Sequence, residues 1–186
     1  MEKLKDIKKY IKPEVSNYHT DVPLDYLKDK LDRWINEYDL DMNPPYQRGY
    51  VWTDKQKKDY VEYIIRLGES HSLSGKQFYF NHPNWMGNWK TYENGCGFEI
   101  VDGKQRLNTI VEFINNEFPD KKGVYYNDFS SVSKRKFTDH QLFTYQEMND
   151  TCTDEEVLEQ FLLVNFAGVP QSEDHLQFVE KILKRN

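Results

Sequence analysis

The sequence predicts one folded domain in which several helices combine with a few short strands. Apolar residues recur at helical spacing in several stretches, and short apolar runs between loops are typical of strands. The chain has 186 residues, which suits a single domain over residues 1–186 with a sizeable core. Hydrophobic residues make up 38% and charged residues 30% of the chain, a balance typical of a folded, soluble protein.

Charge and cysteine usage argue against several classes of protein. The net charge of −6 argues against a general nucleic-acid coat protein, although it allows a local basic pocket. Cys96 and Cys152 form no paired motif, so nothing indicates a secreted disulfide scaffold. Residues 1–20 are predicted to form a peripheral arm or helix; they contain no signal peptide, and no apolar run is long enough to span a membrane. We therefore expect a cytoplasmic protein that does not associate with membranes.

Two helices are predicted in the first third of the chain. Asp21 would cap the first helix, with Pro23 in its first turn and its end near Tyr38. The predicted apolar face of this helix consists of Leu24, Leu27, Leu31, Trp34 and Ile35. Thr53 or Asp54 would cap the second helix, whose apolar face consists of Tyr60, Val61, Ile64, Ile65 and Leu67.

A proline-stiffened segment, residues 41–52, connects these two helices. Pro44 and Pro45 keep its backbone extended and forbid a helix. In one interpretation its aromatic residues pack on neighbouring helices and Arg48 pairs with an acid. In the other, the rigid segment presents Gln47 and Arg48 to a ligand, and arginine suits a phosphate because its guanidinium matches two oxygens at once.

A strand and a long loop are predicted next. Residues 76–81 are typical of a strand, and residues 82–97 of a loop that joins two antiparallel strands. The loop carries three aromatic residues, Trp85, Trp89 and Tyr92. These rings either stack on a base, close over a site or fold back onto the core. Three potential metal ligands lie in this region, His71, His82 and Cys96, but their spacing matches no zinc pattern.

The stretch with the strongest signal for a binding site is residues 98–118. An apolar run typical of a strand leads into the turn Asp102–Gly103, and apolar residues then recur at helical spacing. The first N–H groups of a helix have no partner inside it and lie at the positive end of its macrodipole, so they can hold an anion. Lys104 and Arg106 would add charge there, and Gly103 would let a ligand approach the backbone. The alternative is ordinary capping chemistry with solvated cations.

The rest of the chain predicts one strand and two helices. Residues 119–145 look irregular apart from a short strand at 141–145. The basic run at 134–136 is either the solvated start of a helix or a contact for nucleic-acid backbone. A helix is expected over 153–168, with Val157, Phe161, Leu162 and Val164 facing inward, and a last helix over 172–182.

Three blocks of sequence resemble the signature of one family. They are NPPYQRGYVW at 43–52, EIVDGKQRLNTI at 99–110 and FLLVNFAGVPQSED at 161–174. In this order they look like the N-terminal domain of GmrSD-type restriction endonucleases, over roughly residues 24–176. That domain resembles the ParB/sulfiredoxin fold. The resemblance therefore implies an α+β domain with a small mixed sheet surrounded by helices, followed by C-terminal helices.

The resemblance also implies an activity. In this family an Asp-Gly-Gln-Gln-Arg block is tied to binding and hydrolysis of a nucleoside triphosphate, so we expect an NTPase or phosphotransferase that uses Mg²⁺. The matching block is Asp102–Arg106, in which Lys104 replaces a glutamine. The expected catalytic residues are Asp102, Arg106, Arg48 and Gln105, with Asp102 as the metal ligand. The expected nucleotide-binding residues are Gln47, Arg48, Gly103, Lys104, Gln105, Arg106 and Asn165.

Alternative functions and partners follow from the same features. The domain could be a non-catalytic module that recognises DNA, including modified DNA, or a partner protein. It could also be a decoy or inhibitor, because the substitution at Lys104 departs from the family block. The chain ends at Asn186 with no HNH nuclease motif, so we expect that it is not a nuclease by itself and that a separate nuclease subunit is a possible partner in phage defence.

Overall fold

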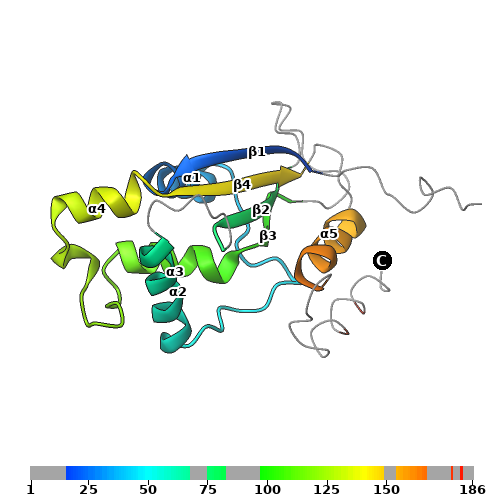
Figure 1. Ribbon diagram of the computed structural model, residues 1–186. Coiled ribbons are helices and arrows are strands. Elements are labelled where there is room, and N and C mark those ends of the chain that lie inside the picture. The colour runs from blue at the N-terminus through cyan, green and yellow to red at the C-terminus, as the bar shows by residue number, and fades with distance from the viewer. Residues whose placement is uncertain are drawn as a thin grey trace, which may run out of the picture.

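A four-stranded mixed sheet forms the centre of the structure (Figure 1). The computed structural model describes residues 16–67, 75–82, 97–148 and 154–166, together with Gln177 and Lys181. The strands are β1 (Ser16–Pro23), β2 (Gln77–Asn81), β3 (Glu99–Asp102) and β4 (Leu142–Met148), in the spatial order β1-β4-β2-β3. Strand β4 pairs antiparallel with β1 and parallel with β2, and β2 pairs antiparallel with β3.

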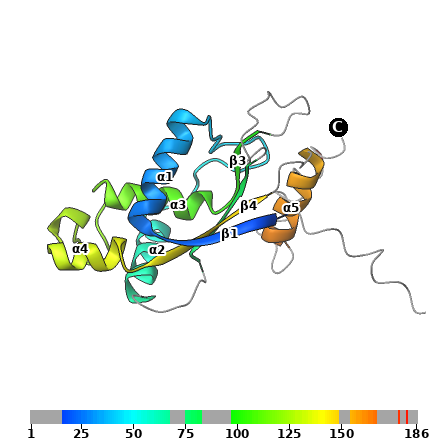
Figure 2. The ribbon, with the colours of Figure 1, turned by 90° about the horizontal axis from the view of Figure 1, so that it is seen from above.

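Helices pack around this sheet. They are α1 (Leu24–Glu37), α2 (Asp54–Leu67), α3 (Lys104–Ile114), α4 (Ser131–Thr138) and α5 (Asp154–Phe166), with the short 3₁₀ helix η2 (Tyr126–Asp128) before α4. Helices α2 and α3 contact each other beside the sheet, and α5 contacts β3. In both views α4 and α5 lie at opposite ends of the molecule (Figures 1 and 2). The expected α+β class, with a small mixed sheet surrounded by helices, is confirmed.

The main core forms between the sheet and helices α1 and α3. Trp34 of α1 is only 3% exposed, and its ring makes edge-on contacts with Phe80, Phe98 and Tyr145 at centroid distances of 5.0, 5.2 and 5.5 Å. These partners belong to β2, the residue before β3, and β4. One tryptophan therefore fixes α1 against three separate segments.

A second, smaller core cluster holds α5. Its buried members are Tyr46, Val101, Met148, Val157, Leu158 and Phe161. The ring of Tyr46 packs against that of Phe161 at 5.0 Å. This cluster brings α5 beside β3 and beside the start of the proline-stiffened segment.

Most predicted elements match the structure, but the first strand differs from the prediction. Residues 16–20, predicted as part of a peripheral arm or helix, form β1 together with Asp21 and Val22. Pro23 is the last residue of β1 and directly precedes α1, so this helix begins later than predicted. The hydroxyl of Thr144 donates to the Asp21 carboxylate across the β1–β4 pair. The Asp21 side chain therefore links two strands of the sheet and does not cap α1. The residues of β1 are mostly polar, which is why their alternation carries no strand signal.

Four smaller differences concern one helix face and the extent of other elements. Ile35, predicted to face inward, is 41% exposed. Helix α3 ends at Ile114 although apolar residues continue at helical spacing to Phe118, because Asn116 adopts a left-handed backbone with φ of 67°. The strand predicted at residues 141–145 extends to Met148, and α4 occupies part of a stretch predicted to be irregular.

Several predictions lie outside the described residues. They concern residues 1–15, His71, the loop aromatics Trp85, Trp89 and Tyr92, Cys96, Cys152 and Gly168. In the last predicted helix the two described residues, Gln177 and Lys181, are helical and exposed. Within the part of the chain that is described, no helix is long and apolar enough to cross a membrane.

Candidate functional site

A cavity of about 390 Å³ lies where the proline-stiffened segment, the end of β3, the start of α3 and α5 meet. This volume falls within the usual range for small-molecule sites. The cavity is lined by Gln47, Arg48, Trp52, Asp102, Gly103, Lys104, Gln105, Arg106, Phe161, Val164 and Asn165. The structure therefore brings together every residue that the sequence singled out for the site, from three blocks far apart in the chain.

Gly103 makes the turn from β3 into α3. Its φ of 99° and ψ of 1° lie in the left-handed region, which glycine adopts without steric cost. A Cβ at this position would lie 2.5 Å from Cδ1 of Phe78, a core residue of β2. Among the described residues no side chain caps the start of α3. The helix thus presents its first N–H groups close to the cavity.

Two polar side chains join the proline-stiffened segment to β3 and α3. The Gln47 amide donates from Nε2 to the carbonyls of Ile100 at 3.1 Å and Val101 at 2.7 Å. The Lys104 ammonium, in a side chain only 3% exposed, donates to the carbonyl of Arg48 at 2.9 Å. Burial lowers the pKa of Lys104, and the Asp41 carboxylate opposes this shift. Both side chains therefore hold the backbone that carries Arg48.

Gln105 ties the next part of the segment to α3. Its Nε2 donates to the carbonyl of Gly49 at 2.9 Å, and its Oε1 accepts from the N–H groups of Val51 at 3.0 Å and Trp52 at 3.3 Å. Both ends of the amide are thus bonded to main chain. The ligand-binding roles expected for Gln47, Lys104 and Gln105 stay predictions, and their polar groups hold the segment in place.

Tyr50 anchors the far end of the segment through a polar network. Its hydroxyl lies 2.8 Å from the Thr109 hydroxyl and donates to Glu112 at 3.2 Å. Glu112 also forms an ion pair with Lys57 of α2 at 2.7 Å. The segment is therefore fastened along its length to β3, α3 and α2, which makes it a fixed wall of the cavity.

The charged groups of the cavity are mainly positive. Arg106 pairs through Nη2 with Oδ2 of Asp102 at 2.5 Å, one helical turn apart, and their side chains are 25% and 21% exposed. Arg48 comes from the proline-stiffened segment; it is exposed and also lines the cavity. The lining thus contains three cationic side chains, those of Arg48, Lys104 and Arg106, and one carboxylate, in a chain of net charge −6. A local excess of this kind favours an anionic ligand.

Metal binding at the cavity would depend on few protein ligands. In the described part of the chain, no group of three or more His, Cys, Asp and Glu side chains is arranged to hold a metal. Asp102 is the carboxylate of the cavity lining. One carboxylate is compatible with Mg²⁺, which usually binds one or two carboxylates together with substrate phosphates and water.

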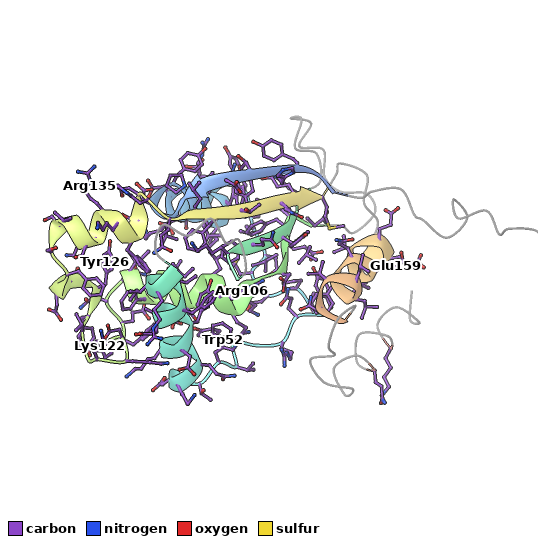
Figure 3. All side chains as sticks on the ribbon, viewed as in Figure 1. Trp52, Arg106, Lys122, Tyr126, Arg135 and Glu159 are labelled. Atoms are coloured by element: carbon purple, nitrogen blue, oxygen red, sulfur yellow. The ribbon has the colours of Figure 1, made fainter. Side chains whose placement is uncertain are left out.

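Three apolar lining residues were not assigned to the site from the sequence. Trp52 comes from the same segment as Arg48, and Phe161 and Val164 come from α5 (Figure 3 labels Trp52 and Arg106). Phe161 precedes Asn165 by one helical turn, so the two residues lie on the same face of the helix. This spacing is the sequence signal that could have assigned Phe161 to the site. Asn165 itself, expected to bind the nucleotide, lines the cavity, and its amide donates to the carbonyl of Phe161 at 2.9 Å.

The basic run at residues 134–136 lies away from the cavity. It is part of α4, at the end of the molecule opposite α5 (Figure 1). Lys134 donates to the carbonyl of Asn127 at 3.1 Å, and Arg135 pairs with Asp139 at 3.3 Å. This run therefore adds nothing to the charge of the cavity.

Comparison with known proteins identifies one family. Residues 28–184 match the model of the family described as GmrSD restriction endonuclease, N-terminal domain. No curated protein and no solved structure matches the chain, so the ParB/sulfiredoxin-like topology stays a prediction.

Proposed function

We propose that this chain, which belongs to the family of N-terminal domains of GmrSD restriction endonucleases, binds a nucleoside triphosphate in the cavity at the start of α3. It then hydrolyses the nucleotide or transfers its terminal phosphoryl group. One observation carries the proposal: Arg48 and Arg106, from distant blocks of sequence, line a single cavity together with the uncapped start of a helix.

Phosphoryl transfer needs positioning and charge neutralisation more than a covalent nucleophile. In the proposed complex the first N–H groups of α3 hold phosphate oxygens, as helix starts commonly do. Arg106 and Arg48 neutralise the charge that develops on the transferred group. Gln47, Lys104 and Gln105 fix the backbone around Arg48. This backbone is therefore already ordered before a ligand binds, which lowers the entropy cost of binding.

Asp102 would hold Mg²⁺ or orient the attacking oxygen. A bound Mg²⁺ would neutralise phosphate charge. The carboxylate also pairs with Nη2 of Arg106 at 2.5 Å, and both residues line the cavity. A phosphate oxygen that approaches Nη2 of Arg106 would therefore compete with Asp102.

Titration of the protein with a panel of nucleoside triphosphates, with and without Mg²⁺, tests the proposal. Binding is followed by calorimetry and hydrolysis by released phosphate. Arg106→Ala and Arg48→Ala are each expected to weaken binding and abolish turnover while the fold survives. Arg135→Ala is the matched control, because this arginine is 73% exposed on α4 and lies away from the cavity (Figure 3). Unchanged binding and turnover in both cavity variants would contradict the proposal.

DNA binding through the same arginines is the competing outcome. Affinity for duplex DNA that falls steeply with rising salt, together with no response to nucleotides, would favour a DNA-recognition module. Membership of a restriction family gives the chain a DNA-related context. We extend the proposal accordingly to a cytoplasmic role in defence, with a nuclease subunit as partner.

A further inference from the structure

Part of the cavity lining is apolar, which phosphate chemistry does not require. Trp52, Phe161 and Val164 line the cavity alongside the cationic residues and Asp102. A polyphosphate gains nothing from apolar surface, because its oxygens need hydrogen-bond donors and positive charge. These apolar lining residues therefore suit a different part of the ligand.

Trp52 is the less buried of the two aromatic residues in the lining. Phe161 is only 3% exposed, since its ring packs against Tyr46 in the second core cluster. Trp52 is only partly buried. Val164 has no ring and offers only a small aliphatic contact.

The position of Trp52 is fixed in two ways. Its N–H donates to Oε1 of Gln105 at 3.3 Å, which ties its backbone to α3. Its ring packs edge-on against Tyr60, at a centroid distance of 5.4 Å and an angle of 68°, and the Tyr60 hydroxyl donates to the Gly75 carbonyl at 2.7 Å. A ring held in this way needs little ordering when a ligand binds.

We propose that Trp52 stacks against the base of the bound nucleotide and so provides the preference for a nucleotide over a bare polyphosphate. This inference rests on the proposed function, since it divides the same cavity into a phosphate half at Gly103, Arg106 and Arg48 and a base half at Trp52. Stacking tolerates every base because each base has a π face. Trp52 would therefore strengthen binding of nucleotides in general, with the larger purines favoured.

The competing explanation is that Trp52 only covers the core beside Tyr60. Loss of such cover would lower stability and weaken every ligand of the cavity to a similar extent. Base stacking would instead affect only ligands that carry a base. The ratio of the affinity for a nucleotide to the affinity for a bare polyphosphate, measured on one variant, separates these explanations. A general loss of folded protein affects both affinities equally and so cancels in this ratio.

The experiment measures the affinity of the full chain for a purine nucleoside triphosphate and for inorganic tripolyphosphate. The proteins compared are the wild type, Trp52→Ala, Trp52→Phe and Tyr26→Ala. Tyr26 is the matched control, an aromatic residue 54% exposed on α1 that does not line the cavity. Trp52→Ala is expected to weaken nucleotide binding roughly tenfold or more and to leave tripolyphosphate binding within about twofold. Trp52→Phe keeps a ring and is expected to retain most of the nucleotide affinity.

The outcomes separate this inference from the proposed function. Wild-type protein that binds neither ligand would refute the proposed function and the inference with it. Wild-type protein that binds both ligands, while Trp52→Ala weakens both equally or neither, would refute the stacking role alone. A loss confined to the nucleotide, and missing in Tyr26→Ala, is the result that the inference requires.

Discussion

Replacing Gly103 by alanine tests the turn on which the cavity depends. The backbone φ of 99° lies in the left-handed region, where an alanine Cβ is strained by roughly 1–2 kcal/mol. The new Cβ would also lie 2.5 Å from Cδ1 of Phe78 and 3.4 Å from the Gln77 carbonyl oxygen. Phe78 is fully buried and its ring stacks on that of Phe143 at 5.9 Å, so it cannot move without disturbing the core.

The cost of the substitution follows from these two effects. Displacing a ring in a packed core costs about 1–3 kcal/mol, which adds to the backbone strain. Alanine recovers about 0.4–1 kcal/mol by restricting the unfolded chain. Gly103→Ala is therefore expected to lower the free energy of unfolding by about 1–5 kcal/mol.

Two other glycines provide matched controls. Gly123 has a φ of 81°, and no atom lies within 4 Å of the place that an alanine Cβ would occupy, so Gly123→Ala measures strain without a clash. Gly49 has neither a positive φ nor a close neighbour, so Gly49→Ala is expected to stay within about 0.5 kcal/mol of the wild type. Urea unfolding monitored by circular dichroism gives all three free energies. If Gly103→Ala cost no more than Gly123→Ala, Phe78 would not pack against this turn and our description of it would be wrong.

Three further predictions concern the wall, the ion pair and the core. Gln105→Ala removes three hydrogen bonds to main chain and is expected to cost about 1–3 kcal/mol in urea unfolding. It is also expected to weaken tripolyphosphate binding, because the backbone around Arg48 loses support. Unchanged binding would contradict the role of Gln105 in holding this segment. Asp102→Asn is expected to strengthen Mg²⁺-free tripolyphosphate binding severalfold in calorimetry, because no carboxylate then competes for Arg106, while turnover falls; weaker Mg²⁺-free binding would count against that competition. Trp34→Ala is expected to cost about 3–5 kcal/mol of unfolding free energy, and a loss under about 1 kcal/mol would contradict its central place in the core.

The sequence predicted which residues lie together better than it predicted the sheet. Turn chemistry, proline and arginine have local signatures, and the residues singled out in three short blocks all line one cavity. Strand β1 escaped prediction because most of its residues are polar and its stabilising partner, β4, lies more than a hundred residues away in the chain. Such pairing is a tertiary effect that local patterns do not report.

The contacts inside the site also could not be read from the sequence. Lys104 and Gln105 were expected to contact a ligand, and the structure bonds their side chains to the carbonyls of Arg48 and Gly49. Their type and spacing are equally suitable for both tasks, and only the position of the proline-stiffened segment decides between them. Trp52 was visible as part of an aromatic cluster, but which of these rings lines a cavity depends on the packing of α2 and α5.

A crystal structure of the protein with a non-hydrolysable nucleoside triphosphate tests the central claim most directly. We predict that the phosphate chain lies at the first N–H groups of α3, with the guanidinium groups of Arg48 and Arg106 both within hydrogen-bond distance of phosphate oxygens. Phosphates bound elsewhere, or contacted by neither arginine, would contradict the account.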